Sequence, residues 1–126
     1  MKLLVQERET QALAGFLAAR PAWVSSSLAK AELLRAARRA GASLVGARDL
    51  VDRVALAPVD DDVLECSATS SSTRASLLQP MSLRTLDAIH AATCARLRDR
   101  LSGVVTYDAR MAEALRDLGL RVVAPA

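Results

Sequence analysis

The stretch LRTLDAIHAATCARL, residues Leu83–Leu97, decides how the rest of the chain is interpreted. Its apolar and small residues recur at the spacing of one helix face: Leu83, Leu86, Ile89, Thr93 and Leu97. This pattern predicts an amphipathic helix with that face buried. Asp87 lies near the first turn of the helix, and His90, the only histidine in the chain, follows one turn later. A carboxylate beside a packing face is expected to have a partner or a chemical role.

The length and composition fit one soluble domain spanning residues 1–126. The chain is 52% apolar, which is enough for a substantial core, and it contains one Trp, one Tyr and one Phe. Leu, Val and Ala then fill the core, which favours helices packed on a small sheet over an aromatic-rich β-sandwich. No apolar run approaches the roughly 20 residues of a membrane span, and Glu7 and Glu9 are atypical of a signal peptide. We therefore expect a cytoplasmic protein without membrane attachment.

The cysteines and the net charge narrow the kinds of site that are expected. Cys66 and Cys94 lack Cys-x-x-Cys spacing, so we expect neither a zinc site nor a disulfide. The formal net charge is +3, and fifteen of the seventeen basic residues are arginine, whose geometry suits phosphate. Genomic base composition produces the same arginine bias, so the charge is compatible with nucleic-acid binding without establishing it.

Helical and strand-like segments alternate along the chain, which is the pattern of an α/β domain with a parallel sheet. We expect strands at Ala22–Ser25, Val54–Pro58, Gly103–Tyr107 and Leu120–Val123. We expect helices over Met1–Arg20, Leu28–Ala40, Ala42–Arg53, Asp60–Ala68, Leu83–Leu97 and Asp108–Leu118. Ser26 or Ser27 is expected to cap the second helix. Thr69–Pro80 is rich in serine and predicts a loop, while Met1–Val5 also fits a short strand.

Three acids occupy positions that converge on one edge of such a sheet, because parallel α/β sheets place their sites at the carboxyl ends of the strands. Glu32 lies in the helix after the first expected strand, Asp87 begins the Leu83–Leu97 helix, and Asp108 directly follows Gly103–Tyr107. Clustered carboxylates suit a hard divalent cation such as Mg²⁺, which polarises a phosphate and activates water for in-line attack. No Ser-His-Asp arrangement, Gly-rich phosphate loop or dinucleotide-binding fingerprint competes with this interpretation.

Each acid also has a purely structural interpretation, which the spacing leaves open. Asp108 fits a helix N-cap, and Asp87 fits a first helical turn, where a negative charge complements the helix dipole. Glu32 has Arg35 three residues later, as in an ordinary surface ion pair. His90 fits a packed or hydrogen-bonded helix residue better than a metal ligand.

Several segments resemble PIN-domain ribonucleases, specifically the VapC-type toxins of toxin–antitoxin pairs. LRTLDAIHAAT is very close to the segment carrying one of that family's metal-binding aspartates, here Asp87. VVTYDARMAEAL is similar to the segment that supplies another, here Asp108, and VSSSLAKAELLRA to the segment with the family's glutamate, here Glu32. ERETQALAGFL, PVDDDVLE and GLRVVAP are also similar, so the resemblance covers nearly the whole chain.

The resemblance implies a three-layer α/β/α PIN-like fold with a five-stranded parallel sheet, and an endoribonuclease activity that requires Mg²⁺ or Mn²⁺. The metal-holding catalytic residues are then the three acids already named: Glu32, Asp87 and Asp108. Thr106 is expected to support the site by hydrogen bonding, and Arg84 and Arg110 to contact RNA phosphates. The resemblance also implies structured RNA substrates, a cognate antitoxin protein whose extended tail occupies the active-site groove, and a homodimer.

The chain departs from the family pattern at its N-terminus. The family begins with a central strand that ends in an Asp, whereas LLVQERET aligns with the end of the family's first helix, and residues 1–20 contain no Asp. We therefore expect an N-terminally shortened domain. Either the true start lies upstream of Met1, which the completeness of the other motifs favours, or the chain is a degenerate paralogue with Met1–Val5 in the empty strand position. Metal binding and cleavage are expected to be weak unless the missing strand is restored.

The leading hypothesis from the sequence is a metal-dependent endoribonuclease toxin that a cognate antitoxin neutralises. Its rival is a non-catalytic PIN-like module that binds an antitoxin peptide or RNA without cutting it. A receiver- or flavodoxin-like domain is disfavoured, because the sequence has no acid-rich phosphorylation pocket at its first strand and no phosphate loop.

Overall fold

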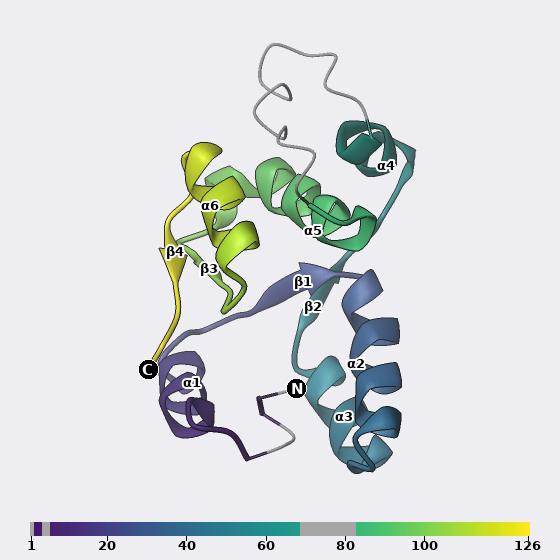
Figure 1. The fold of residues 1–126 in the computed structure, drawn as a ribbon, viewed down its shortest axis with the longest axis vertical. Helices are drawn as coiled ribbons and strands as arrows, with labels where there is room; N and C mark the ends of the chain where they lie inside the picture. The colour runs from purple at the N-terminus through teal and green to yellow at the C-terminus, as the bar shows by residue number, and fades with distance from the viewer. Residues whose placement is uncertain (1, 4–5, 69–82) are drawn as a thin grey trace. The chain divides into compact units, whose positions relative to one another are not determined.

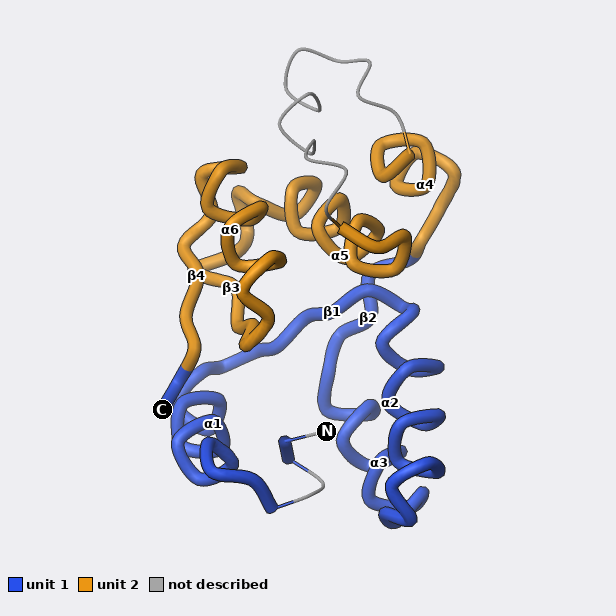
Figure 2. Tube along the Cα trace, viewed as in Figure 1, with its two compact units in different colours: residues 1–58, 125–126 blue, residues 59–124 orange. Residues whose placement is uncertain are grey.

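A computed structural model describes residues 2–3, 6–68 and 83–126 of the chain (Figure 1). The chain divides into two compact units, residues 1–58 with 125–126 and residues 59–124, and each unit is described by itself (Figure 2). Helices and parallel strands alternate in both units. Within the described ranges, no helix combines the length and apolar character that crossing a membrane requires.

The first unit is a crossover of two helices between two parallel strands, preceded by one further helix. Its described elements are α1 (Thr10–Ala18), β1 (Val24–Ser26), α2 (Leu28–Arg39), α3 (Leu44–Asp52) and β2 (Ala55–Ala57). β1 and β2 pair in parallel, with Val24 opposite Ala55 and Ser26 opposite Ala57. The chain passes from β1 to β2 through α2 and α3, which pack against each other. This connection places Glu32 in the second turn of α2, the helix that follows the end of β1.

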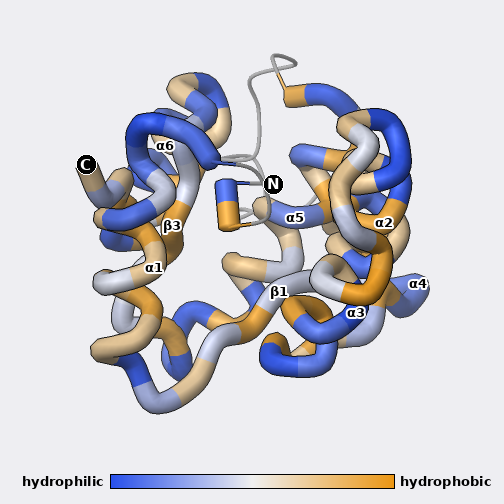
Figure 3. Tube along the Cα trace, turned by 90° about the horizontal axis from the view of Figure 1, so that it is seen from below, coloured by the Kyte–Doolittle hydropathy of each residue, from blue (hydrophilic) through white to orange (hydrophobic). Residues whose placement is uncertain are grey.

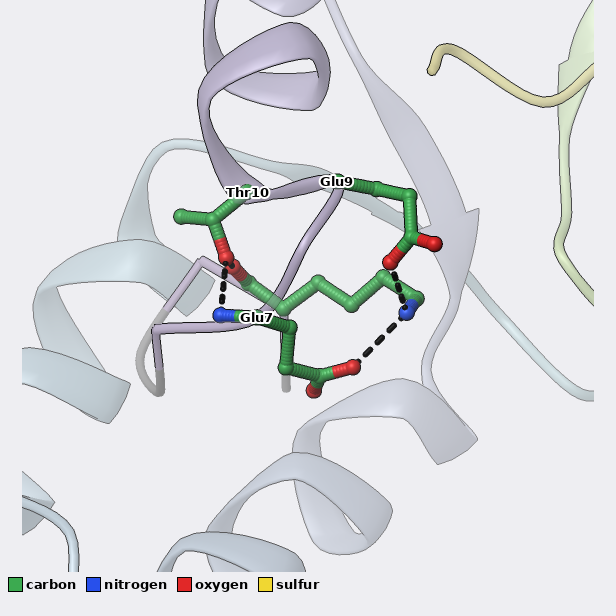
Figure 4. Close-up of polar contacts among 4 residues, drawn as sticks. Glu7, Glu9 and Thr10 are labelled. Atoms are coloured by element: carbon green, nitrogen blue, oxygen red, sulfur yellow. Dashed lines mark hydrogen bonds and ion pairs between the residues drawn. The ribbon is translucent and has the colours of Figure 1, made fainter.

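The predicted N-terminal helix begins only at Thr10, so the prediction is wrong for the described residues 2–3 and 6–9. Ahead of it, Lys2 Nζ donates to Glu7 Oε2 at 2.7 Å and to Glu9 Oε2 at 2.8 Å (Figure 4). Thr10 Oγ1 accepts from the Glu7 N–H at 2.8 Å and donates to the Lys2 carbonyl at 2.6 Å. These contacts fold the segment back onto the start of α1, which prevents it from continuing the helix. The alternative prediction, a strand at Met1–Val5, falls partly outside the described residues. The two residues of this range that are described, 2 and 3, lie in a turn.

The α2–α3 pair lies within the predicted boundaries, although α3 begins two residues later than predicted, and its caps differ from the prediction. Ser27 occupies the N-cap position of α2 without a capping side-chain hydrogen bond, and Ser26 is buried in β1, so the predicted serine cap is wrong. Ser43 caps α3 instead, because its side chain accepts from the Gly46 N–H at 3.1 Å. Gly41 has a φ of 65°, a conformation that glycine adopts without steric cost, and the chain leaves α2 there as predicted.

The second unit packs three helices around a second pair of parallel strands. Its described elements are α4 (Asp61–Ala68), α5 (Thr85–Arg96), the 3₁₀ turn η2 (Arg98–Arg100), β3 (Val104–Val105), α6 (Ala109–Asp117) and β4 (Val122–Val123). β3 pairs with β4, with Val104 opposite Val122, and α6 connects the two strands. The buried cluster of this unit lies between α5 and α6 and consists of Ala91, Met111, Leu115, Leu118 and Leu120. Hydrophilic and hydrophobic residues are interspersed along the helices (Figure 3).

The helix α5 confirms the predicted element but only part of its predicted buried face. Ile89 and Thr93 are buried, and Thr93 Oγ1 donates to the Ile89 carbonyl at 2.9 Å, which satisfies its hydroxyl. Leu86 is 47% exposed, so its predicted burial is wrong. Ala91, Ala92 and Thr93 are consecutive buried residues, so the middle of α5 is covered on more than one side, and the periodicity that places Leu86 on a helix face does not determine what covers the first turn.

Parallel pairing of the strands is confirmed, but they form two separate ladders. β1 pairs with β2 and β3 with β4, and the part of the chain that the structure describes has no strand joining these two sheets and none before α1. The predicted loop at Thr69–Pro80 lies outside the described residues. The observed strands are shorter than the predicted ones, because a strand extends only as far as a neighbouring strand supplies hydrogen bonds, and an apolar run does not determine where that neighbour ends.

Candidate functional site

Asp108 is fixed at the start of α6 through both its side chain and its backbone. Its Oδ1 accepts a hydrogen bond from the Met111 N–H at 2.8 Å, which makes Asp108 the N-cap of α6. Its own N–H donates to Thr106 Oγ1 at 3.2 Å, and the Thr106 N–H donates to the Val123 carbonyl at 3.2 Å. The predicted structural role of Asp108 is therefore present. Capping engages Oδ1, so Oδ2 of this exposed residue is available to another ligand at the end of β3.

Asp87 lies in the first turn of α5 and is half-buried. In the described part of the chain its carboxylate makes no hydrogen bond and no ion pair. Ala91, one turn later, is fully buried and packs in the same cluster as Met111 of α6. Asp108 likewise precedes Met111 by three residues, so each aspartate lies one helical turn from a member of the same buried cluster. The carboxylate oxygens of Asp87 are therefore available to a ligand.

Glu32 lies on α2 of the first unit and is half-buried, whereas both aspartates belong to the second unit. Among residues 2–3, 6–68 and 83–126, no three acidic, histidine or cysteine side chains form a group able to hold a metal ion. Asp87 and Asp108 therefore belong to the helices α5 and α6 of the second unit, and Glu32 belongs to α2 of the first.

The chemistry of the predicted donors fits a hard divalent cation. All three are carboxylates, and Mg²⁺ and Mn²⁺ take oxygen ligands. Burial raises the pKa of the Cys94 thiol, which favours its protonated form and makes it a poor ligand for softer metals. His90 is half-buried one turn after Asp87. The oxygen donors therefore define the kind of ion that this chain suits.

The predicted supporting residues flank the two aspartates. Thr106 holds the Asp108 N–H as described above, and Arg84 occupies the N-cap position of α5, three residues before Asp87. Arg110 lies in the first turn of α6, and both arginines are exposed. Exposed guanidinium groups beside carboxylates can bind the phosphates of a ligand held there. Arg35, Arg38 and Arg39 of α2 are also exposed but are not among the predicted site residues. The signal that could have identified them is the excess of basic residues in this segment of the sequence.

Comparison with known proteins assigns the family. The model of the PIN domain matches residues 1–116. Ribonuclease VapC46 of Mycobacterium tuberculosis (strain ATCC 25618 / H37Rv) is 42% identical over 132 residues, which cover 99% of this chain and 91% of that protein. Ribonuclease VapC47 and ribonuclease VapC35 of strain CDC 1551 / Oshkosh are 32% and 40% identical, covering 98% and 99% of this chain and 90% of each relative. No solved structure matches the chain with comparable significance. The chain belongs to the PIN-domain family, alongside relatives named ribonuclease VapC.

Proposed function

We propose that this protein is a metal-dependent endoribonuclease toxin that a cognate antitoxin neutralises. Membership of the PIN-domain family and similarity to proteins named ribonuclease VapC support the reaction class. The observation that carries the proposal is Asp87, a half-buried carboxylate without a partner among the described residues, which lies one helical turn from the same buried cluster as Asp108. Its RNA substrate, its cytoplasmic location and its assembly as a homodimer are part of the same proposal.

Each predicted side chain has a distinct role in this proposal. Asp87, Asp108 and Glu32 would hold Mg²⁺ or Mn²⁺, which supplies an activated water and stabilises negative charge on the scissile phosphate. Thr106 keeps the backbone of Asp108 in the orientation that leaves Oδ2 outside the helix cap. Arg84 and Arg110 bind RNA phosphates on either side of the carboxylates and so position the scissile bond. With three carboxylates and no Asp in residues 1–20, we propose weak metal binding and slow cleavage for this 126-residue chain.

A second function is favoured by one observation of the sequence, namely that residues 1–20 contain no Asp, whereas the family's first strand ends in one. A PIN-like module without a complete metal centre would bind RNA or an antitoxin peptide and leave the RNA intact. The two functions differ in whether the protein cleaves RNA and in whether that cleavage depends on the carboxylates. A cleavage assay with substituted carboxylates therefore decides between them.

The first prediction concerns Asp87. Asp87→Asn keeps the size and polarity of the side chain but removes its charge, so Mg²⁺-dependent cleavage of RNA is expected to fall at least ~100-fold, as for loss of a group that stabilises the transition state. Glu113→Gln is a matched control, because Glu113 is an exposed acid on α6 outside the proposed site and should retain full activity. Cleavage of a labelled RNA is measured with Mg²⁺ and with EDTA, and circular dichroism confirms that both variants are folded.

Two outcomes would contradict the proposal. If the folded Asp87→Asn variant cleaves RNA as fast as the wild-type chain, Asp87 is not required for cleavage and the proposed mechanism is wrong. Binding of RNA by the wild-type chain, without any cleavage at high Mg²⁺ or Mn²⁺ concentration, identifies the non-catalytic module instead.

A further inference from the structure

Helix α2 carries a concentration of positive charge that the proposed catalytic residues do not use. Its twelve residues, LAKAELLRAARR, contain four basic side chains and a single acid, Glu32. The formal charge of α2 is therefore +3, which equals the net charge of the entire chain. Acidic and basic residues balance over the rest of the sequence, so the excess charge of the protein resides on this one helix.

Three of these basic residues, Arg35, Arg38 and Arg39, form what we call the arginine strip. They lie on one side of α2, because residues three and four positions apart are neighbours on a helix surface. All three are exposed, whereas Ala37 is fully buried. Within the described ranges none of the three side chains makes a hydrogen bond or an ion pair, so their guanidinium groups are open to solvent.

The arginine strip starts beside Glu32 and leads away from it. Arg35 and Arg39 follow Glu32 by three and seven residues, which places all three on the same face of α2. With a rise of 1.5 Å per residue, the strip extends roughly 10 Å along the helix axis from Glu32. The phosphates of a nucleic-acid strand recur every few ångströms along its backbone. An RNA strand with one phosphate near Glu32 therefore has further phosphates within reach of the arginine strip.

The helix dipole explains only part of this arrangement. Basic side chains in the last turn of a helix are stabilising, and Arg38 and Arg39 occupy that turn of α2. Arg35 lies before the last turn, where the dipole gives it little stabilisation. Arginine also binds phosphate through paired, coplanar N–H donors, which gives the strip a geometry suited to a polyanion.

We propose that the arginine strip is an accessory RNA-binding surface that holds the phosphate backbone of the substrate outside the catalytic acids. The identity of the polyanion rests on the proposed ribonuclease function. The strip contributes affinity and position rather than chemistry, so its effect is on RNA binding and on KM, with kcat unchanged.

Binding without cleavage tests the proposal directly. The affinity of a fluorescein-labelled single-stranded RNA is measured in EDTA at several salt concentrations, for the wild-type chain and for the triple variant Arg35→Ala, Arg38→Ala, Arg39→Ala. The slope of log Kd against log salt concentration is expected to fall by about 2, because each lost contact to a single strand removes about 0.7. Arg116→Ala is the matched control, since Arg116 is an exposed arginine in the last turn of α6, and its slope should change by less than about 0.7.

Arg35→Gln separates RNA binding from the helix dipole, and it serves as the readout if the triple variant is unfolded by circular dichroism. It should weaken RNA binding at low salt while leaving the urea midpoint of unfolding unchanged. An unchanged slope in the folded triple variant, or unchanged affinity in Arg35→Gln, overturns the proposal. Equal loss of binding to poly-glutamate and to RNA also overturns it, because the strip would then recognise an acidic polypeptide.

The test distinguishes this inference from the proposed function. If the wild-type chain cleaves RNA with Mg²⁺ and the strip variants bind RNA as well as it does, the ribonuclease proposal is supported and the arginine-strip proposal is contradicted. Strip-dependent RNA binding without cleavage confirms the strip and removes the ribonuclease, and a wild-type chain that binds no RNA overturns both.

Discussion

Asp108 combines a structural and a chemical position in one side chain. Oδ1 caps α6 by accepting from the Met111 N–H, and the N–H of Asp108 is held by Thr106 Oγ1. The helix cap therefore fixes the carboxylate at the end of β3 and leaves its second oxygen available. A structural role and a metal-binding role at this residue are compatible, because they use different oxygens.

Two substitutions at Asp108 separate these roles. Asn caps a helix about as well as Asp, so Asp108→Asn should change the unfolding free energy by only about a few tenths of a kcal/mol, while Mg²⁺ binding is lost with the charge. Asp108→Ala removes the cap as well and should destabilise the chain by about 1 kcal/mol. Urea denaturation measures the stability and isothermal titration calorimetry the metal binding. Equal destabilisation by the two variants would contradict the capping role.

At the scale of elements, one ion pair links α4 to α5. Arg96 Nη1 donates to Asp60 Oδ2 at 2.6 Å, and Asp60 Oδ1 accepts from the Val63 N–H at 3.1 Å at the start of α4. The Arg96 hydrogen bond, followed by the Val63 N–H, lowers the pKa of Asp60 below its usual value of 3.8. Because the folded pKa is the lower one, the pair stabilises the fold above pH 3.8, and this contribution is lost as the pH falls through the folded pKa.

The corresponding prediction compares unfolding at two pH values. Arg96→Ala should lower the urea midpoint at pH 7, and the difference from the wild-type chain should shrink as the pH falls below 3.8. The effect is small, because both side chains are largely exposed. Arg100→Ala, an exposed arginine in η2, is the control and should show no such pH-dependent difference. A difference that is constant with pH would contradict the ion pair as its cause.

The elements were predictable from the sequence where a local signal settles them. The ends of α2 and α6 agree with the predicted helix ends to within one residue, Gly41 and Gly119 with positive φ follow them, and Asp108 caps α6. The errors occur where contacts outside the helical repeat decide the outcome. The pairing of Lys2 with two glutamates shortens α1, and the exposure of Leu86 depends on what packs against the first turn of α5, neither of which helical periodicity encodes.

At the scale of the whole molecule, the parallel strands were predictable and their division into two ladders was not. Apolar runs such as Val104–Val105 indicate a strand, but the choice of neighbour depends on backbone hydrogen bonds between distant segments. The same holds for the candidate site. Motif resemblance selects Glu32, Asp87 and Asp108, whereas no sequence pattern measures how the two units place them. The concentration of charge on α2 was readable from composition once the limits of that helix were known.

Metal binding gives the last prediction, because a ligand that binds only the folded state stabilises it by mass action. If the three acids hold Mg²⁺, the unfolding free energy should rise with Mg²⁺ concentration and reach a gain of about 2.7 kcal/mol when free Mg²⁺ is about 100 times its Kd. Thermal unfolding followed by circular dichroism measures this gain. Asp87→Asn and Glu32→Gln should each remove most of it, since fewer than three carboxylates remain.

The matched control is again Glu113→Gln, which changes the net charge of the chain by the same amount as each test variant but lies outside the proposed site. It should retain the full Mg²⁺-dependent gain, so that a general effect of charge on cation binding is separated from loss of a ligand. A gain that persists in Asp87→Asn places the bound cation elsewhere. A gain that is lost in Asp87→Asn but kept in Glu32→Gln restricts the metal to the second unit and excludes Glu32 from the ligand set.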